Sequence, residues 1–177
     1  PASEAEAATA VVNVPTSDDL TTLHGASEGS FVSPQRLGYV KDREHVAGFA
    51  SHAFERLPRL VDGENWLHEP TEHWAVRRLE LVSLLKHKSP RVYISEVLPR
   101  LEELEEAATR EPGEFETAAL AKLQAGEDIV TRASVNRIEM LGSLRAAKSC
   151  LECHSVEHGE LLGAFSYTLV RDPLLQD

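Results

Sequence analysis

Three segments of the chain carry apolar side chains at helical spacing. In 98–110 (LPRLEELEEAATR) and 111–126 (EPGEFETAALAKLQAG) these side chains recur every three or four residues, and Gly126 is a natural helix end. In 42–57 (DREHVAGFASHAFERL) one helical face carries His45, Phe49 and His52. The pattern predicts a helix in each segment. The two helices in the middle of the chain need a sheet or another helix to cover their apolar faces.

Four shorter segments are typical of β-strands. Side chains alternate in character along 77–85, 136–144 and 163–170, and 91–95 is rich in residues that favour strands. The residues between the last two segments are numerous enough for the chain to turn back, so we expect these two strands to pair. The residues between these two strands then form a connection between paired strands, and not a long helix.

The N-terminal residues differ in composition from the rest of the chain. Residues 1–30 mix Ala, Ser, Thr, Glu and Gly with few large apolar side chains, which is typical of a flexible segment, with a short helix around 18–24. Of all 177 residues, 42% are apolar, enough to build a core without disulfide crosslinks. We therefore expect a flexible N-terminal segment over 1–30 and a single domain over 31–177.

The connection between the last two predicted strands contains both cysteines of the chain. Cys150 and Cys153 are two residues apart, and His154 follows at once. Cys-x-x-Cys-His is the signature of covalent haem attachment: each thiol adds to a vinyl group to form a thioether, and the adjacent imidazole reaches the iron. The motif predicts one haem c, held by Cys150 and Cys153, with His154 as the proximal iron ligand.

Two other interpretations of the cysteine pair remain open. A redox dithiol uses the same Cys-x-x-Cys spacing, although it does not require a histidine after the second cysteine. A zinc site built from Cys150, Cys153, His154 and His158 would have suitable ligand types, but four ligands within nine residues are cramped and a distant second ligand pair is missing. A structural disulfide would close too small a loop to constrain the fold.

Charge and hydropathy restrict the partners. With 18 basic and 29 acidic side chains, the formal net charge is -11, which disfavours binding to nucleic acid or to an anionic membrane surface. No stretch approaches the roughly 20 apolar residues needed to span a bilayer, so we expect no membrane insertion. The first residues, PASEAEAATAVV, lack the features of a signal peptide. If the protein is exported, its signal has been removed.

The run RIEMLGSLRAAKSCLECHSVEHGELLGAFSYTLV resembles the C-terminal third of c-type haem domains with a PAS-like fold. In that family a strand leads into Cys-x-x-Cys-His, a short loop follows, and a G-x-x-x-G-A-x-S strand closes the sheet. The matching residues here are Gly159, Gly163, Ala164 and Ser166. Upstream, a WE-x-x-AL helix of the family is matched in position by Phe115, Glu116, Ala119 and Leu120, with Phe in place of Trp.

The resemblance covers about residues 76–170 and implies an α+β fold: a PAS-like antiparallel sheet with flanking helices and a covalently bound haem. Members of the family occur as free-standing periplasmic or thylakoid-lumen proteins and as sensor modules of bacterial signalling proteins. The resemblance therefore implies a periplasmic or otherwise exported location for this chain.

The iron ligand opposite His154 is the open point of the haem interpretation. A histidine from the N-terminal half is favoured, because a group far from the motif in sequence can approach the other face of the ring. We select His52, which has Phe49 and Phe54 beside it, with His45 on the same helical face as an alternate. The remaining options are another histidine among His24, His68, His73 and His87, the only methionine, Met140, or an open site. Two basic residues before the motif could pair with haem propionates: Arg145 and Lys148.

Three functions use this attachment chemistry. A mono-haem cytochrome that transfers electrons to a redox partner protein is favoured, because a covalent haem survives exchange between partners and an acidic surface steers a basic partner. The first alternative is a haem-based redox or gas sensor, and the second is a zinc-stabilised binding module. No catalytic set is visible beside the motif, so we expect no enzymatic activity. The oligomeric state is left open.

Overall fold

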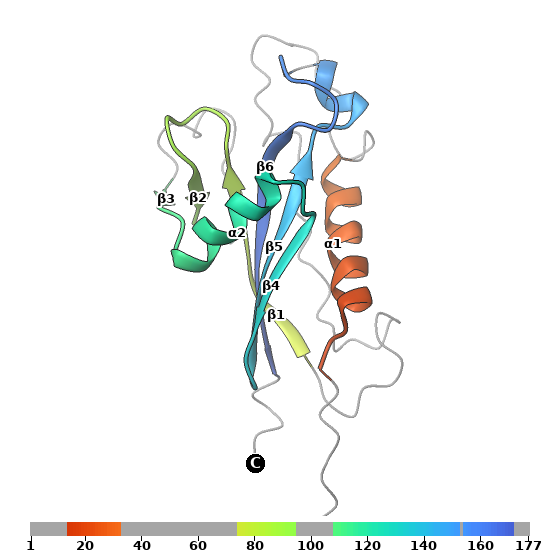
Figure 1. Cartoon of the computed structure of the whole chain (residues 1–177), viewed down its shortest axis with the longest axis vertical. Coiled ribbons are helices and arrows are strands. Elements are labelled where there is room, and N and C mark those ends of the chain that lie inside the picture. The colour runs from red at the N-terminus through yellow and green to blue at the C-terminus, as the bar shows by residue number, and fades with distance from the viewer. Residues whose placement is uncertain (1–13, 33–73, 95–107, 153, 172–177) are drawn as a thin grey trace, which may run out of the picture.

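The computed structural model describes residues 14–32, 74–94, 108–152 and 154–171, which form two α-helices, a short 3₁₀ helix and one antiparallel sheet (Figure 1). The sheet has six strands in the order β3-β2-β1-β6-β5-β4. This is an α+β architecture. The elements are α1 (Ser17–Val32), β1 (Trp74–Ser83), β2 (Arg91–Tyr93), β3 (Thr109–Arg110), α2 (Glu114–Gln124), β4 (Ile129–Ala133), β5 (Arg137–Arg145), η3 (Lys148–Glu152) and β6 (Leu161–Arg171).

The two longest strands, β1 and β6, pair at the centre of the sheet. β6 also pairs with β5, with Met140 opposite Tyr167. The predicted strands at 77–85, 91–95, 136–144 and 163–170 correspond to β1, β2, β5 and β6, and the predicted pairing of the last two is confirmed. The sequence patterns did not predict β4, the edge strand that pairs with β5.

The two predicted helices in the middle of the chain have different outcomes. The helix expected over 111–126 is confirmed as α2, and Gly126 follows its end with a φ of +110°. The helix expected over 98–110 is wrong at its last three residues, because Ala108 is not helical and Thr109 and Arg110 pair with β2 as strand β3. Residues 98–107, and the helix expected over 42–57, lie outside the described residues.

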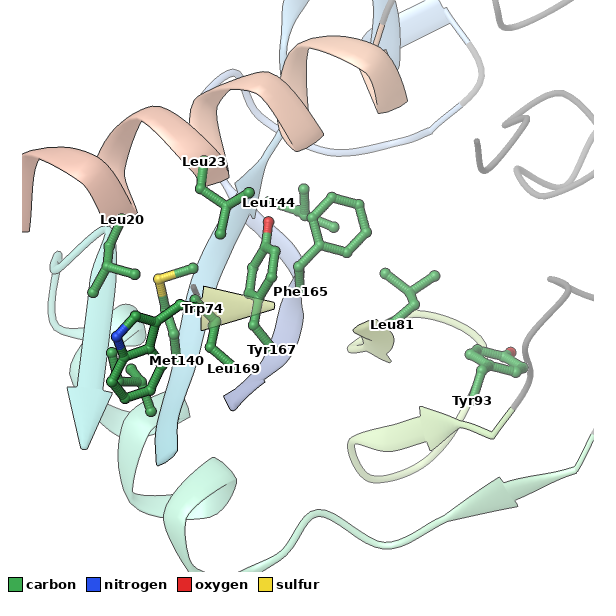
Figure 2. Packing of buried hydrophobic residues seen from close by; sticks show 11 residues of the cluster. Leu20, Leu23, Trp74, Leu81, Tyr93, Met140, Leu144, Phe165, Tyr167 and Leu169 are labelled. Atoms are coloured by element: carbon green, nitrogen blue, oxygen red, sulfur yellow. The ribbon is translucent and has the colours of Figure 1, made fainter. Parts of the chain in front are cut away.

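One face of the sheet packs against α1. Leu20 and Leu23 of α1 contact a cluster of buried side chains from β1, β5 and β6 that includes Met140, Leu144 and Tyr167 (Figure 2). The short helix expected around 18–24 is confirmed, but α1 extends over Ser17–Val32 and belongs to the core, in a segment for which the composition favoured flexibility. The composition was misleading because only part of the buried stripe is apolar: His24 and Ser27 are also buried, at the spacing that continues Leu20 and Leu23.

The other face of the sheet packs against α2. A second cluster joins Ala119, Leu120 and Leu123 of α2 to Val82, Val92, Val130, Leu141 and Ala164 of the strands. Because both faces are covered, a central strand buries consecutive residues on opposite sides, as Leu81 and Val82 do in β1. Neither α1 nor α2 is long and apolar enough to cross a lipid bilayer.

A buried histidine fastens α1 to the sheet. His24 Nε2 lies 2.9 Å from the carbonyl oxygen of Ser143 and Nδ1 lies 3.0 Å from the hydroxyl of Tyr167. A carbonyl only accepts, so Nε2 carries the proton and donates to it. Burial lowers the pKa of His24, although the bond to Ser143 and the charge of Asp128 oppose this shift. The imidazole is therefore neutral near pH 7, and the Tyr167 hydroxyl donates to its bare Nδ1.

A buried ion-pair network fastens the start of α2. The Arg110 guanidinium donates to both carboxylate oxygens of Glu116, at 2.6 and 2.7 Å, and also to Glu80 of β1. Glu116 Oε1 accepts a further bond of 2.6 Å from the Ser166 hydroxyl. Burial alone would raise the pKa of Glu116, but bonds from Arg110, Ser166 and the Gly113 N–H outweigh it and lower the pKa to about 2. The helix start is thereby held against the central strands.

Gly142 of β5 is required by the close approach of α1. A Cβ atom at this position would lie 2.3 Å from Nδ1 of His24, so a side chain would displace the imidazole and its two hydrogen bonds. We predict that Gly142→Ala lowers the free energy of unfolding by about 2 kcal/mol, within the range for overpacked cores, as measured by urea denaturation. The control is Gly25→Ala, on the exposed side of α1 with open space around it. Equal stabilities of the two variants would contradict this account.

Candidate cofactor-attachment site

The Cys-x-x-Cys-His motif lies on the connection between β5 and β6, as the sequence predicted, at one end of the sheet (Figure 1). Two backbone hydrogen bonds close the base of this loop: the Ala146 N–H donates to the Glu160 carbonyl and the Gly159 N–H donates to the Ala146 carbonyl, both at 2.8 Å. Gly159 has a φ of +84°, which favours glycine. The loop is thus a continuation of the β5–β6 hairpin.

A backbone hydrogen bond joins the first and last described residues of the motif. Cys150 lies in η3, and its carbonyl accepts a 2.9 Å hydrogen bond from the N–H of His154, which follows the end of η3. Both side chains are half-buried, and the Cys150 thiol is free. Cys153 lies outside the described residues.

The surroundings of the motif suit a group held by thioethers and one imidazole. Apolar side chains lie within the loop, with Leu151 39% exposed and Val156 half-buried. Within the described part of the chain, no three His, Cys, Asp or Glu side chains form a cluster that could hold a metal ion. Cys153, one of the four residues of the alternative zinc site, lies outside the described residues, so the zinc interpretation stays open beside the haem interpretation.

Two of the four described histidines are already engaged elsewhere. His24 uses both ring nitrogens in the core, and His87 forms a 3.0 Å hydrogen bond with the Tyr93 hydroxyl. His154 and His158 belong to the motif loop. The four remaining histidines lie outside the described residues, and among them are the preferred distal ligand and its alternate: His45, His52, His68 and His73. The prediction of His52 stays a prediction.

The C-terminal half of α1 lies beside the end of β5 that leads into the motif (Figure 1). Burial raises the pKa of Glu28, the nearby Asp128 carboxylate raises it further, and Arg145 opposes both. This electrostatic contact places Glu28 next to the last residue of β5. The chain therefore leaves α1 at Val32 on the same side of the molecule as the motif.

Met140 is a core residue. Its side chain is fully buried, and it packs near Leu20 and Trp74 in the cluster under α1 (Figure 2). Along β5 it precedes Arg145 by five residues, a distance of about 17 Å in an extended strand. This position does not suit an iron ligand opposite His154, so Met140 serves packing.

Arg145 is also committed to the fold, which differs from its expected role beside the haem propionates. Its Nη2 donates to the carbonyls of Leu123 and Glu127, at 2.8 and 3.1 Å, and its Nε bonds to Asp128 at 3.2 Å. Leu123 lies in the last turn of α2 and Glu127 in the turn that follows it, so Arg145 fastens the end of the helix to β5. Lys148, in contrast, is exposed, and its expected role stays a prediction.

The sequence reasoning missed two polar groupings. The first is the buried cluster of His24 and Tyr167, whose signal was a histidine within a stripe of leucines. The second is an open polar cleft of about 340 Å³ beside the start of α2, lined by Arg78, Arg110, Arg132 and Glu139 among others. Its charges largely pair with one another, as Arg132 does with Glu139 at 2.6 Å. The cleft lies toward the start of β5, away from the motif.

Comparison with known proteins gave no relative. The chain matches no protein-family model, and searches of curated proteins and of solved structures found no significant match.

The contacts of Arg145 lead to a prediction that separates the two roles considered for it. Arg145→Gln removes donors from two carbonyls and should lower the free energy of unfolding by about 1–2 kcal/mol, measured by urea denaturation. Lys148→Gln is the control and should change it by less than about 0.5 kcal/mol. If Arg145→Gln leaves stability unchanged and shifts the haem midpoint potential instead, Arg145 belongs to the propionate site.

Proposed function

We propose that this protein is a mono-haem c-type cytochrome with a PAS-like fold that transfers electrons outside the cytoplasm. The observation that supports the proposal is the backbone hydrogen bond between half-buried Cys150 and His154, on a loop that two further backbone hydrogen bonds fasten to the β5–β6 hairpin. We infer that the thiol of Cys150 and the imidazole of His154 serve the same bound group.

The chain's own residues would hold the haem as follows. The thiols of Cys150 and Cys153 would form thioethers, and the imidazole of His154 would bind the iron. The hydrogen bond from His154 to the Cys150 carbonyl restrains the turn between them, and Leu151 and Val156 supply apolar surface. A bound haem would supply an iron ion whose oxidation state changes by one electron.

The arrangement of the sheet supports the PAS-like part of the proposal. Apart from the two-residue β3, the strand order is β2-β1-β6-β5-β4, with the first and last strands adjacent at the centre. A PAS-like sheet has this arrangement. The motif precedes the last strand, where the resemblance expects it, and Gly163, Ala164 and Ser166 are buried in that strand.

Electron transfer is favoured over sensing by the charge around the motif. Glu152, Glu157 and Glu160 are exposed on the loop, whereas Lys148 is its exposed basic residue. Together with a net charge of -11, these carboxylates would steer a basic redox partner toward the haem. Steering of this kind raises association rates, which benefits a carrier that exchanges partners.

The haem should be covalent. We predict that wild-type protein produced with a cytochrome c maturation system keeps its haem through denaturation and acid-acetone extraction, because thioethers do not dissociate. The double variant Cys150→Ser, Cys153→Ser should lose all of it. Haem staining of a denaturing gel measures the result. A colourless wild-type protein that binds zinc stoichiometrically would contradict the proposal and support the zinc-stabilised module.

The sixth iron position separates a carrier from a sensor. A carrier with His52 as the second ligand should have a six-coordinate, low-spin visible spectrum and bind carbon monoxide slowly. Replacing His52 by Ala should produce a high-spin spectrum and fast carbon monoxide binding. His45→Ala is the matched control from the same predicted helix. Fast carbon monoxide binding by the wild type would show an open or displaceable site and favour the sensor.

A further inference from the structure

The buried pair of Tyr167 and His24 has a geometry that haem attachment does not require. Tyr167 is 1% exposed and His24 is 5% exposed, and they join the centre of the sheet to α1. Their rings meet edge to face with centroids 5.9 Å apart, and Phe165 packs at 6.1 Å against the tyrosine ring. The phenol is thus enclosed by aromatic rings with an imidazole as its hydrogen-bond acceptor.

The tautomer of His24 is fixed by the backbone. The Ser143 carbonyl takes the Nε2 proton at 2.9 Å, which leaves Nδ1 as an acceptor 3.0 Å from the phenol oxygen. If Nδ1 gained a proton, the imidazolium would keep its bond to Ser143 and donate to the phenol oxygen. The site can therefore move the phenolic proton to Nδ1 without moving any heavy atom.

The environment permits this proton transfer only when an electron leaves as well. Burial raises the pKa of Tyr167 far above its usual range, a hydrogen bond from Ser27 lowers it in part, and Glu28 raises it further, so a phenolate is disfavoured. A neutral tyrosyl radical carries no such charge. Burial lowers the pKa of His24 and so disfavours the imidazolium formed beside it, while the hydrogen bond to the Ser143 carbonyl and the charge of Asp128 offset this in part.

We propose that Tyr167 is a site of proton-coupled oxidation with His24 as its proton acceptor. A strong one-electron oxidant, of the class of high-valent metal-oxo species or ruthenium(III) polypyridyl complexes, takes one electron from the phenol. The O–H bond breaks and an N–H bond forms at Nδ1, giving a neutral tyrosyl radical and an imidazolium. Return of one electron reverses both changes. This reaction does not depend on the haem proposal, because the oxidant is external.

The chain offers a close comparison in Tyr93. This tyrosine is equally buried, and its hydroxyl lies 3.0 Å from Nε2 of His87. His87 is half-buried, so water can compete with the Tyr93 hydroxyl for hydrogen bonds to the imidazole. The Ser143 carbonyl fixes the tautomer of His24, and among the described residues no backbone carbonyl does the same for His87. Tyr93→Phe therefore serves as the matched control.

The experiment generates ruthenium(III) tris-bipyridine by flash-quench in solutions of the full-length chain and follows radicals by transient absorption and electron paramagnetic resonance. Protein containing ring-deuterated tyrosine identifies the tyrosyl signal by its narrowing. We expect a neutral tyrosyl radical in the wild type, with its yield reduced at least about tenfold in Tyr167→Phe and retained in Tyr93→Phe. Formation should be slower in D₂O, because the O–H proton moves with the electron.

The proton acceptor is tested by His24→Phe, which keeps an aromatic ring near Gly142 and removes both nitrogens. Radical formation should slow at least about tenfold, equivalent to about 1.4 kcal/mol in the barrier. If this variant does not fold, as judged by circular dichroism, the D₂O comparison on the wild type decides the proton step. An unchanged yield in Tyr167→Phe, or a wild-type radical formed equally fast in D₂O, would overturn the proposal.

Discussion

The pairing of β1 with β6 at the centre of the sheet constrains the rest of the structure. A helix covers each face of these two strands, α1 on one side and α2 on the other. Neither face can therefore carry the solvated polar side chains found on a sheet with one face open to water. Every polar side chain that points from these strands into a layer must find a partner there. Among the described residues, Ser83 bonds to the Leu85 carbonyl nearby, and two further sets of contacts each attach one of the helices.

The two sets of contacts that attach the helices differ in charge. Under α2, Ser166 and Glu80 point toward a carboxylate and a guanidinium, and the group is an ion-pair network that reaches the edge of the layer at Arg110, 29% exposed. Under α1, Tyr167 meets an uncharged imidazole in a layer of leucines and aromatic rings. Charge is tolerated where water can reach it, and the drier layer uses neutral donors and acceptors.

Local patterns sufficed where an element is amphipathic on its own. The strands β1, β5 and β6, the helix α2 and the position of the motif between two paired strands all follow from alternation, helical spacing and order. β4 escaped prediction because Thr131, Arg132 and Ala133 are exposed at the sheet edge and show no apolar alternation. The packing of α1 was not predicted, because it depends on a residue that is distant in sequence. Gly142 has no side chain, and this leaves room for the His24 ring.

The candidate site was predictable in kind and only partly in detail. The backbone hydrogen bond between Cys150 and His154 is a local feature, because the motif lies within five residues. Arg145 could not be assigned, because its partners at Leu123, Glu127 and Asp128 come from another element and only the fold brings them near. The type of a residue indicates which chemistry its side chain can perform. The contacts that the side chain makes in the fold decide whether it is available for that chemistry.

The two hydrogen bonds at the base of the motif loop separate it from the paired strands. Residues 147–152 and 154–158 lie on the far side of the bonds that Ala146 forms with Gly159 and Glu160, and Leu151 and Glu152 are exposed there. Substitutions in the described part of the loop therefore leave the pairing register of β5 and β6 unchanged, so the composition of the loop and the stability of the sheet can vary separately.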